Sequence, residues 1–344
     1  MHVHLREPGA PHKEDWYTGT SAAVAGGVVA VVDMPNTNPP TLTAGRLGEK
    51  EQIAGRTALC DYGFYFGTDG NNLAEFEKVY DRVCGLKLYL NETTGSLLIE
   101  DKKKIENIFR AWPKGKPILA HAEGDTLAHA IDLAAQCGQR LHGCHIATAH
   151  DLARVVEAKQ GGVKITCEVT PHHLLLTEKD AARLGAFGQM KPEVGTDDDR
   201  EALWEGIQRG VVDSIATDHA PHTREEKQSG IPVWGVPGLE TSLPLMITAC
   251  EERHIMLEVL QRLMSVNPRV ILGLPDEENS WVEITREEYR LEENSLKTKC
   301  GWSPFVGRIL TAKVRRTVIR GTEVMKDGKI MARAGSGKNL NSFP

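Results

Sequence analysis

The chain has 344 residues, of which 40% are hydrophobic and 26% are charged, and its formal net charge is −6 at pH 7. This length is sufficient for one large domain or two moderate ones. The negative charge is spread along the sequence and no apolar run reaches membrane-spanning length, which argues against nucleic-acid-binding and membrane proteins.

Short β-rich runs alternate with helical patterns along most of the chain. The predicted strands are residues 2–5, 27–33, 61–66, 84–90, 117–121, 141–146, 163–169 and 212–217. The predicted helices include residues 13–25, 72–82, 100–111, 125–137, 149–159 and 198–209, followed by 241–252 and 256–265. This alternation is typical of a parallel sheet, and eight strands favour an α/β fold of the closed (β/α)8 TIM-barrel type. An open doubly wound sheet is the main alternative, but no GxGxxG motif follows the first strand.

The pattern changes from about residue 275. Residues 280–291, 308–321 and 323–334 are typical of short strands joined by turns. The sequence therefore predicts a barrel over residues 1–274, a small β module over 275–336 and a loose tail over 337–344. The seven cysteines are scattered without a close CxxC pair, which favours reduced thiols and a cytoplasmic protein.

Polar and ionisable side chains recur at the ends of the predicted strands. His2 and His4 alternate on the first strand and so share one face. Lys87 lies inside the strand predicted over residues 84–90, and the ends of the other later strands, or the residues just after them, are Asn36, His121, Cys144, His145, Glu168, His173, Asp218 and His222. Each has a structural explanation when taken alone, such as a core histidine or a helix-capping aspartate. Barrel enzymes build their sites at these strand ends, so the combined pattern predicts a metal site.

The residue types favour zinc, because imidazole nitrogen and carboxylate oxygen are zinc ligands. Lys87 conflicts with this site, since a buried ammonium would repel the metal. Carboxylation of its amine by carbon dioxide would remove the conflict, because a carbamate has two oxygens that can bridge two metals.

Nine motifs carry a resemblance that spans nearly the whole chain. They are HVHLREPG, MPNT, GLKLYLNET, AHAE, CHIA, TCEVTPHHL, TDHAPHT, PGLET and CGWSPF. In this order they resemble the dihydroorotases of the amidohydrolase superfamily, most of all the dihydroorotase domain of the CAD-like multifunctional proteins of pyrimidine synthesis. The resemblance implies a barrel with two zinc ions bridged by carboxylated Lys87. His2, His4 and Asp218 would hold the first zinc, His121 and His145 the second, and a further zinc is expected near Cys144 and Glu168.

The resemblance also implies roles for other residues. Asp218 would be the general base of the reaction, and His173 would support the ligands without binding metal. The substrate-binding residues would be Arg6 and Asn36 on the carboxylate, His222, Trp234 and Gly235 on the ring, Lys191 in place of a substrate-contacting arginine, and Thr93 in a gating loop. The chain departs from the CAD pattern at Lys191, Thr94 and Trp234, where that pattern has arginine, phenylalanine and proline. The family's strands before the HxH motif are missing here, so the β module is expected to be incomplete.

The expected reaction is the reversible zinc-dependent cyclisation of N-carbamoyl-L-aspartate to L-dihydroorotate. A hydantoinase or allantoinase is the nearest alternative, and Arg6 argues against it because a substrate without a carboxylate would leave this side chain unpaired. An inactive dihydroorotase-like scaffold domain is a second alternative, although such a domain would be expected to lose metal ligands. The expected partners are a small-molecule substrate, a second copy in a homodimer and aspartate transcarbamoylase.

Overall fold

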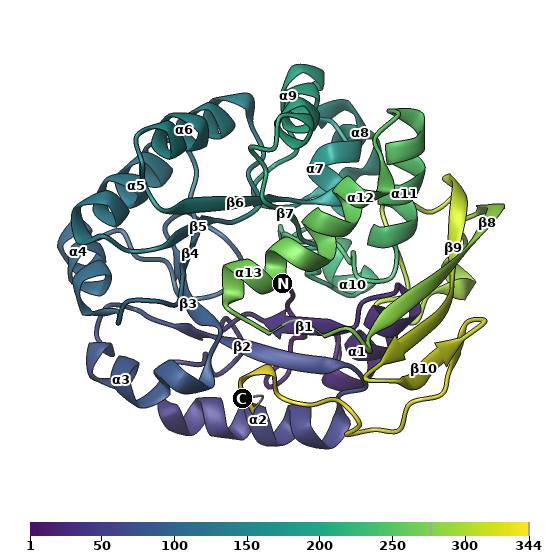
Figure 1. Cartoon of the computed structure of the whole chain (residues 1–344), viewed down its shortest axis with the longest axis horizontal. Helices are drawn as coiled ribbons and strands as arrows, with labels where there is room; N and C mark the ends of the chain where they lie inside the picture. The colour runs from purple at the N-terminus through teal and green to yellow at the C-terminus, as the bar shows by residue number, and fades with distance from the viewer. Residues whose placement is uncertain (276, 343–344) are drawn as a thin grey trace.

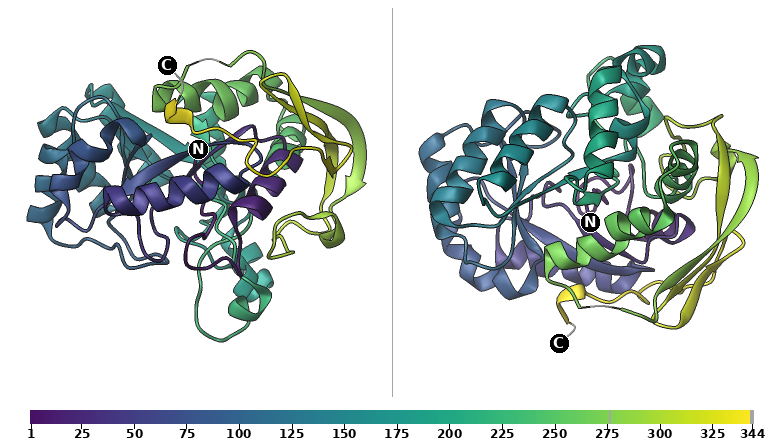
Figure 2. Two further views of the ribbon diagram at one scale, coloured as in Figure 1. Left: turned by 90° about the horizontal axis from the view of Figure 1, so that it is seen from below. Right: turned by 45° about the horizontal axis from the view of Figure 1, so that its top comes forward.

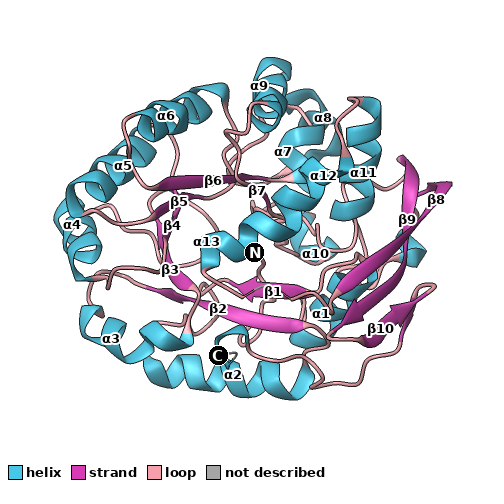
Figure 3. Cartoon of the chain, in the orientation of Figure 1, coloured by secondary structure: helices cyan, strands magenta, loops and turns pink. Residues whose placement is uncertain are grey.

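The computed structural model describes residues 1–275 and 277–342 and places a curled parallel sheet inside a ring of helices (Figures 1 and 3). Seven strands follow one another around the sheet in sequence order, each parallel to the next. They are β1 (Ala30–Asp33), β2 (Asp61–Gly67), β3 (Gly85–Tyr89), β4 (Ile118–His121), β5 (Leu141–Gly143), β6 (Ile165–Val169) and β7 (Ser214–Ile215). The predicted TIM-barrel architecture is confirmed.

The strands form because their apolar runs are covered on both faces. Every residue of β2, β3, β4 and β5 is buried, with the helices outside and the barrel interior inside. Trp16 on the first helix packs edge-on against Tyr62 and Phe64 of β2, with ring centroids 5.7 Å and 5.5 Å apart. The main core therefore lies between the sheet and the helices.

The predicted first strand, residues 2–5, is wrong as a regular strand. Only Val3 bridges its neighbours, pairing in parallel with Asp33 at the end of β1 and with His219 beyond β7. The backbone N–H of Leu5 donates to the Asp33 carboxylate at 2.7 Å, so a side chain replaces the next rung of the ladder. This short segment still fills the eighth position and closes the barrel between β1 and β7.

The helices that surround the sheet largely match the predicted ones. They are α1 (Trp16–Ala25), α2 (Ala44–Thr57), α3 (Phe76–Val79), α4 (Lys102–Ala111), α5 (Asp125–Cys137), α6 (Ala149–Gln160), α7 (Pro171–Leu175), α8 (Glu178–Leu184), α9 (Asp197–Gln208), α10 (Arg224–Lys227), α11 (Ser242–Glu252), α12 (Leu257–Gln261) and α13 (Asn267–Leu272). The helix predicted over residues 72–82 is instead α3 flanked by two 3₁₀ turns, and the one over 256–265 ends in a π turn. No described helix is long and apolar enough to span a bilayer.

A separate antiparallel sheet follows the barrel, as the sequence predicts. Its strands are β8 (Trp281–Arg290), β9 (Ile309–Ile319), β10 (Thr322–Lys326) and β11 (Lys329–Ile330), paired in the order β11-β10-β9-β8. β9 packs against α11, and the sheet covers one side of the barrel (Figure 2).

The last described residues are packed rather than loose. Tyr62 N–H donates to Lys338 O at 2.9 Å, Gly337 N–H donates to Ala58 O at 3.0 Å, and Leu340 is buried. The segment predicted as a tail thus lies against β2 over residues 337–342, while residues 343–344 fall outside the described part of the chain. The predicted division into domains at residue 274 stays a prediction.

Candidate metal and substrate site

Two histidines and an aspartate meet where the barrel closes. His2 Nε2 lies 3.2 Å from Asp218 Oδ1, and His4 Nε2 lies 3.1 Å from the same oxygen. All three side chains are at most 10% exposed. Val3 brings the two histidines here by bridging to His219, the residue directly after Asp218. One ligand atom from each residue lies within 4.8 Å of the others, which suits a shared metal ion.

A second group lies on the other side of His2. His2 Nδ1 contacts Glu168 Oε1, and Cys144 completes a set whose ligand atoms also lie within 4.8 Å of one another. The second oxygen of Glu168 lies 3.2 Å from Nε2 of His142, a buried residue of β5. Glu168 therefore lies between two imidazoles in the barrel interior.

His121 and His145 form the third part of the cluster. His121 Nδ1 lies 2.9 Å from His145 Nε2, and both side chains are 2% exposed. The remaining ring nitrogens, His121 Nε2 and His145 Nδ1, are buried and have no hydrogen-bond partner among the described residues. Unpaired buried nitrogens are costly unless a further ligand satisfies them. These two atoms are available to a metal.

Lys87 lies fully buried on β3 between these groups. Its Nζ donates to Cys144 Sγ at 3.0 Å and lies 5.0 Å from the centroid of the Tyr89 ring. A thiol and a ring face are weak partners for an ammonium in this position. We call the eight residues of these groups the ligand cluster: His2, His4, Lys87, His121, Cys144, His145, Glu168 and Asp218.

Burial dominates the protonation of the ligand cluster. It lowers the pKa of His4 to about 3 and holds the pKa values of His121 and His145 well below the ordinary value. Burial raises the pKa of the Asp218 carboxyl, although His2 and Lys87 oppose that change. Burial alone would raise the pKa of Glu168 too, but the adjacent His2 and His142 hold it well below its usual range. The imidazoles of His4, His121 and His145 are therefore neutral, the form that binds metal.

Three predicted site residues have left-handed backbone conformations. Their φ angles are 62° at Arg6, 34° at His145 and 40° at Asp218. Such angles are uncommon outside glycine and gather where a fold must direct a side chain into a site. Asp218 lies in the turn that follows β7, and its carboxylate points toward His2 and His4.

Arg6 and Asn36 lie beside the ligand cluster. Arg6 is 7% exposed, its Nε donates to Pro221 O at 3.0 Å, and no carboxylate of the described residues pairs with it within 4.0 Å. Asn36 is already engaged, because its Oδ1 lies 2.7 Å from His4 Nδ1 and its Nδ2 donates to Thr94 O at 3.0 Å. Asn36 thus orients His4 here, and its predicted contact with a substrate stays a prediction.

His222, Trp234 and Gly235 come together beside Arg6. His222 Nε2 lies 3.0 Å from Trp234 O and 3.1 Å from Arg6 Nη2. Gly235 has φ of 131°, and a Cβ there would lie 2.5 Å from Ala220 O, so only glycine fits this close approach. We call Arg6, Asn36, His222 and Trp234 the rim group.

The other predicted residues lie farther from this arrangement. Lys191 Nζ lies 3.1 Å from Glu193 Oε1 and 5.7 Å from the centroid of the Trp234 ring. The residue after Thr93, Thr94, donates from its hydroxyl to Trp234 O at 3.2 Å. Thr93 is half-buried. His173 lies between Thr170 Oγ1 at 2.8 Å and Pro192 O at 3.1 Å, so it joins α7 to the loop before α9. Lys191 and His173 are placed to support the rim rather than the ligand cluster.

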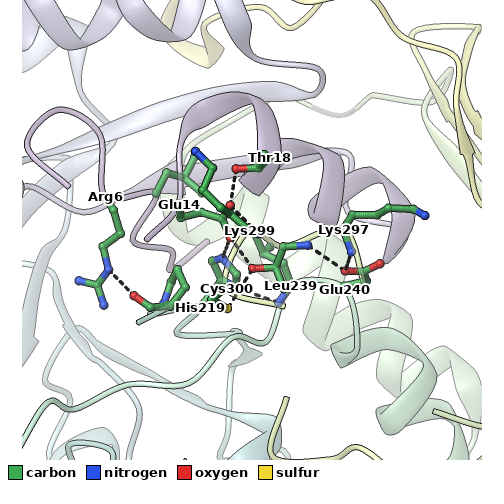
Figure 4. A network of polar contacts seen from close by, with 12 residues as sticks. Arg6, Glu14, Thr18, His219, Leu239, Glu240, Lys297, Lys299 and Cys300 are labelled. Carbon is green, nitrogen blue, oxygen red and sulfur yellow. Dashed lines mark hydrogen bonds and ion pairs between the residues drawn. The ribbon is translucent and has the colours of Figure 1, made fainter. Parts of the chain in front are cut away.

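A buried carboxylate beneath the rim has no counterpart in the sequence-based predictions. Glu14 is fully buried, and it accepts from Thr18, Thr298 and the backbone N–H of Lys299 while its Oε2 lies 3.3 Å from His219 Nε2 (Figure 4). The other imidazole nitrogen, His219 Nδ1, accepts from Gly238 N–H at 3.1 Å. This network ties the turn after Asp218 to a segment about 80 residues further along the chain.

Comparisons with known proteins show which family the sequence resembles. Residues 1–164 match a family model described as dihydro-orotase-like. The chain is 42% identical over 345 residues to the multifunctional protein pyr1-3 of Dictyostelium discoideum. The matched region covers 99% of this chain but only 15% of the length of that protein. It is 32% identical over 390 residues to a dihydroorotase of Methanosarcina acetivorans, covering 99% of this chain and 83% of that one.

Solved structures show the same fold. An L-hydantoinase from Arthrobacter aurescens superposes with a TM-score of 0.94 at 24% identity, over 98% of this chain and 86% of that one. The inactive dihydroorotase-like domain of a Chaetomium thermophilum CAD-like protein superposes with a TM-score of 0.82 at 25% identity. The superposition covers 98% of this chain and 96% of that domain.

Proposed function

Because this chain belongs to the dihydroorotase family of cyclic amide hydrolases, we propose that it catalyses the reversible cyclisation of N-carbamoyl-L-aspartate to L-dihydroorotate. The observation that carries the proposal is Arg6, a buried guanidinium beside the ligand cluster with no carboxylate partner among the described residues. A substrate that presents a carboxylate would satisfy it by a charge-assisted, bidentate contact.

The ligand cluster fits two divalent cations, and we propose zinc. His2, His4 and Asp218 would hold one ion, and His121 and His145, through their unpaired nitrogens, would hold the other. Lys87 would bridge the two as a carbamate, because the anion removes the buried ammonium and offers two oxygens. A third ion at His2, Cys144 and Glu168 is the further candidate. When bound, such ions polarise a carbonyl and lower the pKa of water.

The residues of the chain supply the remaining chemistry. Arg6 binds the substrate carboxylate, and His222 and the Trp234–Gly235 backbone border the ring. The Asp218 carboxylate accepts a proton in the hydrolytic direction and returns it to the leaving nitrogen. In the direction of cyclisation the carboxyl starts protonated. Ring closure removes one ionised carboxylate from the substrate, so it consumes one proton and acid favours the ring.

A pH-stat assay of the purified, zinc-loaded chain tests the proposal, because proton uptake with carbamoyl aspartate and release with dihydroorotate are opposite in sign. Asp218→Asn, which removes the proton carrier, is expected to lose several orders of magnitude in kcat. Turnover of hydantoin or dihydrouracil in preference to dihydroorotate would contradict the proposal in favour of a hydantoinase. A fully metal-loaded chain without turnover of any of these substrates would indicate a scaffold domain.

The cellular setting is a further part of the proposal. The similarity to multifunctional pyrimidine proteins supports a role beside other enzymes of the pathway, with aspartate transcarbamoylase, which makes the substrate, as the proposed neighbour. We also propose a homodimer in the cytoplasm. Light scattering of the chain alone and with that enzyme tests both assemblies.

A further inference from the structure

His222 is a buried imidazole whose two ring nitrogens face groups of opposite kind. Nε2 lies 3.0 Å from Trp234 O, which can only accept a hydrogen bond. Nδ1 lies 3.1 Å from Lys13 Nζ, which as an ammonium can only donate. Burial, with Arg6 and Lys13 nearby, holds the pKa of His222 far below its ordinary value, so the ring is neutral. A neutral ring satisfies both contacts in one tautomer, with its proton on Nε2.

We propose that Lys13 is a positioning residue that fixes His222 as the Nε2–H tautomer and so keeps one end of the Arg6 guanidinium free for the substrate carboxylate. The tautomer itself follows from the contacts in this structure, whereas the benefit to the substrate rests on the proposed function. His222 then donates its single N–H to Trp234 O and has no lone pair left to accept from Arg6.

The same tautomer explains the position of Arg6. Arg6 Nη2 lies 3.1 Å from His222 Nε2, but both atoms carry hydrogen, so this contact is not a hydrogen bond. Arg6 Nε is held by Pro221 O. The guanidinium is therefore fixed at one end and unpaired at the other, which is the arrangement that a substrate carboxylate requires. The opposite tautomer would let His222 accept from Arg6 and would occupy that free end.

Glu226 holds Lys13 in place. Its Oε1 lies 3.0 Å from Lys13 Nζ, and its Oε2 accepts from Thr223 N–H at 3.1 Å as part of the cap of α10. Glu226 Oε2 lies 3.6 Å from His222 Nδ1, which is too long for a hydrogen bond. The carboxylate thus acts on the imidazole through the lysine. Lys13 precedes α1 and is not part of a hydrophobic core cluster of the described residues, so an apolar side chain of similar length can replace it without removing a core residue.

Nitrogen NMR of histidine-labelled, metal-loaded protein tests the tautomer in the wild-type chain, with the His222 signals assigned by their loss in His222→Gln. A protonated Nε2 and an unprotonated Nδ1 are expected. The reverse pattern, or an even mixture of the two tautomers, would overturn the proposal. This measurement needs no activity, so it stands even if the chain fails to turn over dihydroorotate.

Lys13→Met removes the donor and keeps the length of the side chain. It is expected to give a mixed tautomer and to raise KM for dihydroorotate by about tenfold, with kcat changed less than about twofold and zinc content unchanged. Lys13→Arg, which restores a donor, is expected to recover most of the wild-type KM. Lys179→Met is the matched control, because it removes an exposed lysine that pairs with Asp197 at 2.8 Å and touches no histidine. An unchanged tautomer and KM in Lys13→Met would refute the role of Lys13.

Discussion

The ligand cluster and the rim group are built in different ways. Residues of the ligand cluster lie on or directly beside the barrel strands, and their side chains contact one another, as His2 and His4 contact Asp218. Residues of the rim group lie on loops, and backbone carbonyls hold them, as Pro221 O holds Arg6 and Trp234 O holds His222. The strands therefore fix the groups that would bind metal, whereas loop-to-loop contacts fix the groups that would select the substrate.

Lys87→Ala is the most severe way to break the ligand cluster. Removal of the proposed bridge is expected to reduce bound zinc and to lower kcat by roughly three orders of magnitude, since metal ions contribute several kcal/mol to such reactions. Lys87→Arg is expected to fare no better, because a guanidinium cannot become a carbamate. Zinc per chain, measured by mass spectrometry of the metal, and electron density at Nζ check this. A bare amine at full zinc occupancy would contradict the bridge.

Arg6→Met separates the two regions, because it changes the rim and leaves the ligands in place. KM for dihydroorotate is expected to rise by roughly tenfold to a hundredfold, the effect of losing a charge-assisted contact, with bound zinc unchanged. Steady-state kinetics and metal analysis on the same preparation measure both quantities. Arg46→Met is the control, since Arg46 pairs with Glu49 on exposed α2. A wild-type KM would favour a substrate without a carboxylate.

Glu14→Gln tests the support beneath the rim and is expected to have the smallest effect on catalysis. The amide replaces one acceptor oxygen with a donor where the native carboxylate receives only donors, so unfolding should require about 1–3 kcal/mol less free energy. The change in kcat/KM is expected to stay within about threefold. Chemical denaturation and kinetics measure the two effects. A large loss of kcat at wild-type stability would place Glu14 in the chemistry instead.

The sequence indicates the residues of the ligand cluster and of the rim group but not the residues that support the rim, because the two kinds of residue depend on different information. Each strand end marks its own ligand, so His121, His145 and Asp218 follow from local pattern and the barrel rule. In the sequence Lys13 and Glu14 are ordinary charged residues at the start of the helix predicted over residues 13–25, whereas α1 begins only at Trp16. Their partners lie more than 200 residues away, at His222 and Thr298, and nothing in the local sequence indicates these contacts.

The boundaries of helices and strands can likewise be predicted only where the local sequence defines them. Helix α5 lies over residues 125–137 as predicted, because its apolar spacing and the following Gly138 define it locally. The sequence does not indicate α2, whose three glycines weaken the helical pattern, although Thr43 caps its start. The segment 2–5 and β7 are shorter than the strands predicted from the sequence. The Asp33 carboxylate accepts from Leu5 N–H, and the Thr217 hydroxyl donates to His2 O. Such side-chain contacts replace ladder hydrogen bonds and leave no periodic signal.

The barrel closes through the single bridged residue Val3, and this has a consequence for assembly. His4 and Asp218 lie on the two sides of that closure, 214 positions apart in the chain. A cation held by both would act as a cross-link around a very long loop, and such a link offsets roughly 5 kcal/mol of chain entropy. Metal uptake and completion of the barrel are then one thermodynamic event. A chelator would loosen the junction between the first residues and β7 before any other part of the sheet, and hydrogen exchange would rise there first.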